Sequence, residues 1–246
     1  MKADHFDQQK LLALAAEDVA LSQLAHRRRT LPENAAVESA TERERELAAA
    51  VVRAETGVRD LQRDVGRLEG DVETVRQRVT RDQGLLDSGS VSAKQMTDLQ
   101  HEMQSLARRQ SDLEDQELEL MEQLETAEAT LAEARSGHET ARAELERAEQ
   151  LREDALADIA DGTAQHETAR AEAAARIPGD LLALYERVRA QTGGTGAAVL
   201  KARQCKGCRI ELNGRELAAV RNADPHEVTR CENCGRVLVR TAESGL

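Results

Sequence analysis

The chain has 246 residues, 33% of them charged, and a net charge of −12, yet it contains one Phe, one Tyr and no Trp. Because large rigid side chains are so scarce, a single compact globular domain of this length is not expected, and the composition is typical of long helices. No apolar run approaches the length of a membrane span, and charges stand where a secretory signal would be apolar. We expect a cytoplasmic protein with no membrane partner.

The charge is unevenly distributed along the chain. Residues 197–246 carry nine Lys/Arg and six Asp/Glu, a balance of +3, whereas residues 1–196 carry 25 and 40, a balance of −15. Four thiolates and one Zn²⁺ would lower the balance of the C-terminal part to about +1, so charge alone predicts no strong phosphate-binding field there.

Residues 1–176 are expected to form a long antiparallel coiled-coil hairpin. Val recurs every seventh residue from Val51 to Val79, and a second heptad pattern runs from Leu99 to Ala148. Pro32 predicts a kink near residues 30–33. Turn residues predict the tip near residues 87–91, after which Ser92 can cap a helix with Gln95 as its capping-box partner. The two arms, 3–86 and 92–175, are equally long and can pair throughout.

Three seam positions of the second heptad are polar: Gln110, Glu117 and His138. Such residues fix the register or reach out of a partly buried seam, and the alternative is contact with a partner.

A short helix and a Gly-rich linker are expected at residues 177–196, between the hairpin and the C-terminal domain. Asp180 is the expected cap of this helix. Tyr185, the only Tyr, is expected to seal the base of the hairpin against its neighbours, and the alternative is stacking on a base or partner side chain.

The four cysteines form two pairs, Cys205 with Cys208 and Cys231 with Cys234, each separated by two residues. This spacing is typical of a structural zinc site with four thiolate ligands, and it predicts one Zn²⁺ held without an open position for water or substrate. Two disulfides would need an oxidising compartment, and a redox dithiol would need one pair only. Iron could occupy the same thiolates.

Residues 197–246 are therefore predicted to be a small β zinc ribbon, with short strands entering and leaving each cysteine pair: 197–204, 209–212, 226–230 and 236–240. Residues 213–221 are expected to form a turn or a short helix. The ribbon has few apolar side chains, so metal binding should supply its stability.

These features together resemble the actinobacterial form of a bacterial family of C4-type zinc-ribbon, coiled-coil hairpin proteins to which nucleic-acid binding is ascribed. The residues that carry the resemblance are Ile177-Pro178, Leu181 to Arg187, Cys205 to Arg209 and Cys231 to Leu238. Some family members in flagellated bacteria act as adaptors for an alternative sigma factor and for messenger RNA. The resemblance thus implies a mainly α protein with an adaptor role in transcription or RNA regulation.

Three functions compete, and the first is a non-enzymatic adaptor whose hairpin binds a protein partner and whose ribbon docks a second surface. The second is nucleic-acid binding through basic residues of the ribbon, for which the candidate contacts are Lys206, Arg209, Arg230 and Arg236. An enzyme is the third, and it is disfavoured because no nucleophile, base or phosphate loop can be assembled from these residues. We expect no small-molecule substrate.

Overall fold

The computed structural model describes all residues 1–246, in five α-helices and four short strands. Its contacts divide the chain into two compact units. Unit 1 comprises Met1–Pro32 and Leu151–Leu246, and unit 2 comprises Glu33–Gln150. Helix α3 (Ala93–Ala175) is continuous and contributes to both. No helix has the length and apolar character that crossing a membrane demands. The domain boundaries near residues 176 and 196 stay a prediction.

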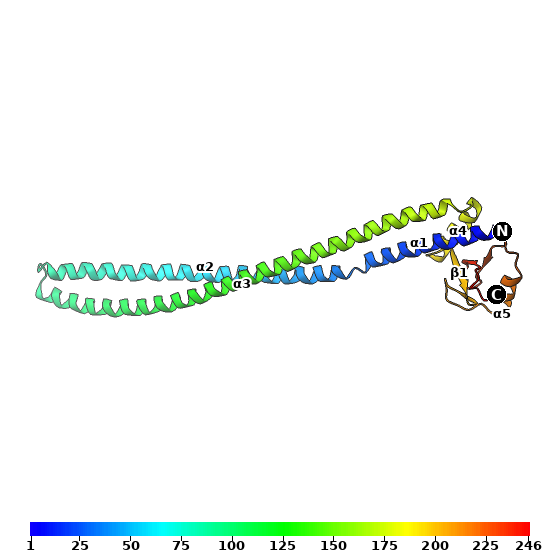
Figure 1. Cartoon of the computed structure of the whole chain (residues 1–246). Coiled ribbons are helices and arrows are strands. Elements are labelled where there is room, and N and C mark those ends of the chain that lie inside the picture. The colour runs from blue at the N-terminus through cyan, green and yellow to red at the C-terminus, as the bar shows by residue number, and fades with distance from the viewer. The chain divides into compact units, whose positions relative to one another are not determined.

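Unit 2 is a pair of helices. Helix α2 (Pro32–Asp87) and the first part of α3 run side by side in opposite directions and are joined by a short turn (Figure 1). The buried side chains of α2 include Val58, Val65 and Val72, which belong to the predicted heptad. The capping box at the turn is confirmed, because Ser92 N–H donates to Gln95 Oε1 (2.9 Å) and Gln95 N–H donates to Ser92 Oγ (3.3 Å).

Ionic pairs cross the seam of unit 2. Arg135 donates to Glu55 at 2.7 Å, and His138 Nε2 lies 2.8 Å from Glu44 Oε1. His138 thus contacts the opposite helix, which agrees with the predicted role of polar seam residues in register. Gln110 bonds instead to Glu114 on its own helix (2.8 Å).

Unit 1 begins with helix α1 (His5–Arg29), whose first turn is capped by the Asp4 carboxylate accepting from Phe6 N–H (2.8 Å). Pro32 is the first residue of α2, a position that needs no N–H donor. Helix α4 (Gly179–Thr192) departs from expectation, because Pro178 and not Asp180 is its N-cap, without a side-chain hydrogen bond. The fixed φ of proline starts the helix early, and this places Asp180 inside the first turn.

The ribbon contains one sheet of four strands in the order β2-β1-β4-β3. The strands are β1 (Ala197–Lys201), β2 (Gln204–Cys205), β3 (Thr229–Arg230) and β4 (Val237–Val239). β1 is parallel to β4, and the other two pairs are antiparallel. Helix α5 (Gly214–Asn222) follows the first cysteine pair and has a complete capping box, Asn213 with Glu216.

The strand expected at residues 209–212 does not form. Only Glu211 makes an isolated bridge, to Gln204. The reason is local: Arg209 has φ of 62°, so the chain turns back at the cysteine pair instead of extending.

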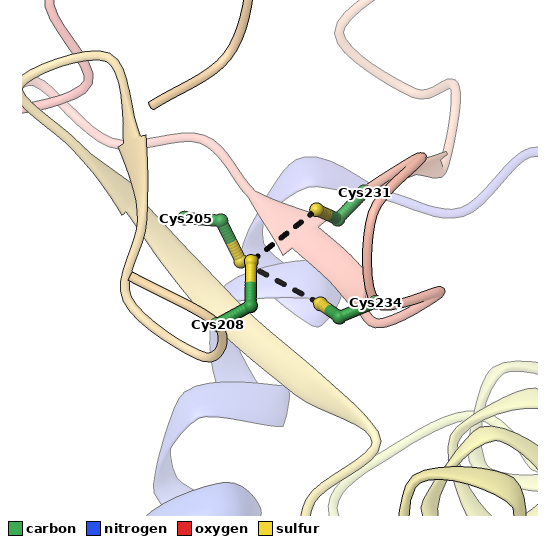
Figure 2. A group of neighbouring side chains, drawn as sticks. All are labelled: Cys205, Cys208, Cys231 and Cys234. Atoms are coloured by element: carbon green, nitrogen blue, oxygen red, sulfur yellow. Dashed lines mark hydrogen bonds between the residues drawn. The ribbon is translucent and has the colours of Figure 1, made fainter. Parts of the chain in front are cut away.

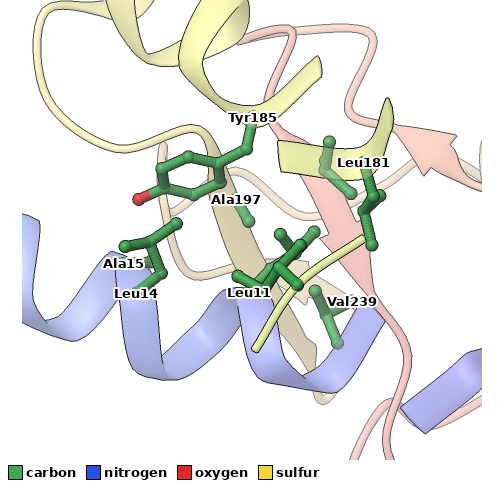
Figure 3. Close-up of a cluster of buried hydrophobic side chains, with 9 residues drawn as sticks. Leu11, Leu14, Ala15, Leu181, Tyr185, Ala197 and Val239 are labelled. Carbon is green, nitrogen blue, oxygen red and sulfur yellow. The ribbon is translucent and has the colours of Figure 1, made fainter. Parts of the chain in front are cut away.

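The sheet has a buried core on each face. On one face Val237 and Val239 pack with Leu11, Leu14 and Tyr185 from α1 and α4 (Figure 3). On the other face Leu200 and Leu238 pack with α5 and the cysteines. The close packing of α4 on the sheet requires glycine at residue 196, because a Cβ there would lie 2.3 Å from the Tyr185 carbonyl oxygen. The ribbon is thereby packed directly against α1 and α4.

Candidate metal centre

The two cysteine pairs, distant in sequence, converge on one point (Figure 2). Cys205 lies at the end of β2, and Cys231 follows β3, so the sheet brings the two turns face to face. The four Sγ atoms lie within 4.8 Å of one another, with Cys205 3.9 Å from Cys234 and Cys208 3.8 Å from Cys231. All four predicted ligands are therefore brought together.

These distances fit a tetrahedral zinc ion. With Zn–S bonds of about 2.3 Å, two sulfurs of a tetrahedron lie about 3.8 Å apart. The same distances are far from the roughly 2.05 Å of a disulfide bond, and all four cysteines are free thiols. Four soft sulfur donors complete the coordination shell of Zn²⁺, so the bound metal would contribute folding free energy and leave no position for a substrate.

The backbone of each turn is shaped by one left-handed residue after its second cysteine. The N–H of that residue donates to the carbonyl of the first cysteine, Arg209 to Cys205 (2.7 Å) and Gly235 to Cys231 (2.8 Å). Gly235 has φ of 75°, which glycine adopts freely, whereas Arg209 adopts φ of 62° at a steric cost of about 1 kcal/mol. The two turns are thus equivalent in backbone but not in sequence.

Burial and hydrogen bonds divide the thiols into two classes. Burial raises the pKa of Cys205, and it raises the pKa of Cys231 to about 12. Burial also acts on Cys234, but hydrogen bonds from the backbone N–H and the side chain of Arg236 prevail and lower the pKa of that thiol to about 7. Arg236 therefore stabilises the thiolate form of a ligand, the role of an outer-shell partner in a metal site.

The candidate partner contacts all lie on or beside the two cysteine turns, but their side chains differ in exposure and hydrogen bonding. These residues are Lys206, Arg209, Arg230 and Arg236. Lys206 and Arg209 are exposed. Arg230 Nε donates to the Gly235 carbonyl (2.7 Å), and Arg236 Nε donates to Thr195 O and Oγ1 (both 3.1 Å). Arg236 is thus engaged in holding the linker, and the partner contacts of all four residues stay a prediction.

A buried ionic cluster centred on Asp18 of α1 was not predicted from the sequence. The Asp18 side chain is fully buried and accepts from Arg170 Nε (2.8 Å) and from the Tyr185 hydroxyl (2.5 Å). Arg189 Nε lies 2.9 Å from the same carboxylate as an ion pair without hydrogen-bond alignment. The available signal was the spacing Leu14, Asp18, Leu21, which puts a carboxylate on the apolar stripe of the helix.

The cluster explains two shifted pKa values. Burial, followed by the hydrogen bond to Asp18, raises the pKa of Tyr185. The hydrogen bond to Asp18 also raises the pKa of Arg170. The Tyr185 hydroxyl stays protonated and the Arg170 guanidinium stays charged, so the negative charge of the buried Asp18 carboxylate is balanced by hydrogen bonds and an ion pair. Tyr185 therefore seals the base, as predicted, and is not available for stacking.

Family models match most of the chain. Residues 14–193 match the CT398-like coiled coil hairpin domain, and residues 204–238 match the C4-type zinc ribbon domain. The second match together with the four adjacent sulfurs establishes one structural Zn²⁺ site.

Relatives and solved structures agree with these matches. Two Mycobacterium tuberculosis proteins, named Uncharacterized protein MT2288 and Uncharacterized protein Rv2229c, are each 39% identical over 240 residues, 98% of both chains. A solved structure from Mycobacterium smegmatis has a TM-score of 0.84 at 35% identity and covers 98% of this chain and 100% of its own. The structure of CT398 from Chlamydia trachomatis shares the fold, with a TM-score of 0.63 at 17% identity over 96% and 98% of the two chains. The chain belongs to the family of CT398-like coiled-coil hairpin proteins with a C4-type zinc ribbon.

Proposed function

We propose that the protein is a non-enzymatic adaptor in which the coiled-coil hairpin binds a protein partner and the ribbon docks a second surface, in transcription or RNA regulation. The observation that carries this proposal is the attachment of a closed zinc site to a helical base. In unit 1 the sheet packs on α1 and α4, so the ribbon is fixed to the helices that lead into the hairpin. Such a unit offers surfaces in a fixed arrangement and no open metal position.

The long helices supply the first of these surfaces. Coiled coils with charged outer positions are suited to helical partners. On α3 an exposed acidic face lies next to two exposed apolar side chains, Leu118 (60% exposed) and Met121 (49% exposed). Exposed carboxylates beside exposed apolar groups are typical of a contact surface rather than of a buried seam.

Affinity capture of the full-length chain from cells, with and without nuclease, tests the adaptor. The informative variant reverses three exposed charges of this face: Glu119→Lys, Glu122→Lys and Glu125→Lys. We expect a reproducible protein partner that is retained after nuclease treatment and lost from the variant, because reversed charges repel a complementary surface. The control reverses three exposed ribbon charges, Lys201, Arg203 and Arg215, and should retain the hairpin partner. A partner set indifferent to the hairpin reversals would contradict the adaptor.

A second candidate is nucleic-acid binding through the ribbon. The observation in its favour is that Lys206 and Arg209 are exposed on one zinc turn, and Arg209 holds a backbone conformation that disfavours a side chain. Against it, residues 197–246 contain no Phe, Tyr or Trp on which a base could stack.

Fluorescence anisotropy with labelled single-stranded RNA and duplex DNA tests this candidate. If phosphates are bound by two to four cations, affinity should fall about tenfold to hundredfold between 50 and 200 mM salt, and Lys206→Glu with Arg209→Glu should remove most of this dependence. Lys201→Glu is the matched ribbon control. Binding that ignores both salt and the paired reversal would exclude phosphate contact through this turn.

A further inference from the structure

A groove lies between α1 and the ribbon within unit 1, bordered by Lys206 and Gly207 of the first zinc turn and by Asp18 of the buried ionic cluster. It has a volume of about 380 Å³. Its floor is apolar, with Leu12 and Val19 from α1 and Ala198 and Val199 from β1. The linker residue Thr195 closes one side. Such concave apolar surfaces are the usual receivers of partner side chains.

The wall that α1 contributes is an uncharged helical face, most of which is exposed. Leu12, Ala16, Val19 and Gln23 are spaced four, three and four residues apart, which places them on one stripe. None is charged, although a third of the chain is. Val19 is 44% exposed, whereas Leu11 and Leu14 on the neighbouring face are fully buried against α4 and the sheet. Leu12 packs at the edge of that core, whereas Ala16, Val19 and Gln23 are exposed, and the stripe has the spacing that packs against another helix.

The groove continues along α1 for the length of a short helix. A second hollow, of about 460 Å³, shares Asp18, Ser22 and Gly194 with the first and extends to Ala25. From Leu12 to Ala25 the helix spans about 20 Å, the length of roughly 14 helical residues or four turns. An occupant of this size is a single amphipathic helix, which fits helix-in-groove recognition.

The charged residues that line the first hollow determine which sign of charge the bound helix should carry. Three of its lining residues are charged: Asp18, Lys206 and Arg236. The charge of Asp18 is balanced by the half-buried Arg170 and Arg189. Lys206 donates to the Gln204 amide oxygen, a neutral acceptor, so it keeps a positive charge to offer, whereas Arg236 donates to Thr195 oxygens and also stabilises the Cys234 thiolate. The uncompensated cation at the rim favours, by local charge complementarity, a partner that carries carboxylates.

We propose that this groove binds an acidic amphipathic helix of a protein partner. The apolar residues of that helix pack on the stripe of Leu12, Ala16 and Val19, and a carboxylate of the helix pairs with Lys206. A protein helix suits the site better than a polynucleotide, because the floor between the cations is aliphatic and offers neither a stacking platform nor a continuous row of cations. This inference rests on the proposed adaptor function and names the chemistry of the partner that docks at the ribbon.

The test uses the full-length, zinc-loaded chain and a displayed library of helical 14- to 18-residue peptides, counter-selected against Val19→Glu. We expect the surviving peptides to carry apolar residues spaced three and four apart together with an excess of Asp and Glu. For a selected peptide, Val19→Glu should weaken binding about tenfold or more and Lys206→Glu about fivefold, because one puts a charge on the floor and the other reverses the rim.

Matched controls are Val52→Glu, at an exposed apolar site on α2 (61% exposed), and Lys201→Glu, at an exposed lysine of the same ribbon; both should leave the affinity unchanged. Tyr185 fluorescence and zinc content verify that each variant is folded. The proposal is overturned if no peptide depends on Val19, or if the selected peptides are basic. It is equally overturned if RNA binding is the property that Val19→Glu removes, or if sedimentation shows that Val19→Glu splits a dimer of this chain.

Failure here is distinguishable from failure of the adaptor. If a hairpin partner is captured from cells but no peptide binds the groove, the groove proposal is wrong and the adaptor proposal is retained. If no hairpin partner is captured but a peptide binds in a Val19-dependent way, the adaptor proposal is wrong and the groove is retained as a peptide-binding site.

Discussion

The two units of the chain bury their side chains in different ways. In unit 2 the buried apolar residues form a single seam between two helices, and most of them retain some exposure, such as Val58 (7%) and Leu131 (9%). In unit 1 the side chains of Tyr185, Leu11 and Val239 are fully covered because helices lie on one face of the sheet and α5 with the metal centre lies on the other.

This difference teaches where the stability of each unit resides. A seam is a repetition of similar contacts, so loss of one side chain affects its neighbours only. The stability of unit 1 depends on two sites, the four thiols and the Asp18 cluster, and each of them connects several helices or strands. We therefore expect localised, moderate effects in unit 2 and large effects, concentrated at these sites, in unit 1.

Removal of the metal should have the largest effect. Structural zinc contributes about 10 kcal/mol or more of apparent folding free energy in small domains, and Cys231→Ser removes a buried ligand. We expect the zinc content, measured by mass spectrometry, to fall from one per chain toward zero. Tyr185 fluorescence should change because the strands that cover it unfold, while the far-UV circular dichroism of the long helices persists.

The single Tyr and the absence of Trp make this experiment specific, because intrinsic fluorescence reports on unit 1 alone. Glu232→Ser, at an exposed residue of the same turn, is the control and should retain zinc. A Cys231→Ser chain with native Tyr185 fluorescence and one bound zinc would contradict the claim that the stability of unit 1 is concentrated at the metal site.

The Asp18 cluster should come second. Asp18→Ala leaves two arginines and the Tyr185 hydroxyl without their buried acceptor, which is expected to lower the free energy of unfolding of unit 1 by about 3–5 kcal/mol. Urea unfolding followed by Tyr185 fluorescence measures this loss. Asp18→Asn should be milder because it keeps an acceptor, and Glu172→Ala, in an exposed pair with Arg176 within unit 1, should change nothing measurable. Equal effects of Asp18→Ala and Glu172→Ala would show that the cluster does not stabilise unit 1.

A seam residue should give a moderate and local effect. Leu113 is 1% exposed, and Leu113→Ala should lower the free energy of unfolding by about 2–4 kcal/mol. The change should appear in circular dichroism and in hydrogen exchange of unit 2, with Tyr185 fluorescence unaltered. Leu118→Ala, at an exposed position on the same helix, is the matched control. Simultaneous loss of both signals would show that the units do not respond separately.

Sequence reasoning worked where structure depends on periodicity or on ligand spacing. The heptad valines, the capping box at Ser92 and the convergence of the four cysteines all follow from short-range rules that tertiary contacts do not override. The zinc ion was likewise anticipated from the cysteine spacing, and the family from a resemblance carried by residues 177–187 together with the cysteine pairs and their flanking residues.

What the sequence did not disclose depends on contacts between distant segments. The expected strand at 209–212 is absent because Arg209 takes a left-handed conformation imposed by the metal turn, which alternation of residue types does not reveal. Asp18 was overlooked because its partners are supplied by α3 and α4, more than 150 residues away in sequence. The groove beside it requires the packing of the ribbon on α1, which no local pattern specifies.

The smallest effect, and the one with a pH signature, belongs to the Tyr185 hydroxyl. Tyr185→Phe keeps the ring in the core and removes one buried hydrogen bond to a charged group, so at neutral pH we expect a loss of about 1–3 kcal/mol, measured by urea unfolding with circular dichroism. The folded pKa of Tyr185 is raised, so its protonated form is favoured by the fold. This contribution is therefore complete below the ordinary tyrosine pKa of about 10 and declines as the pH rises above it. The native chain should lose its advantage over Tyr185→Phe as the pH is raised past that value. A difference between the two proteins that stays constant across the alkaline range would mean that Tyr185 contributes through its ring alone, and that the Asp18 carboxylate is held by its arginines without the hydroxyl.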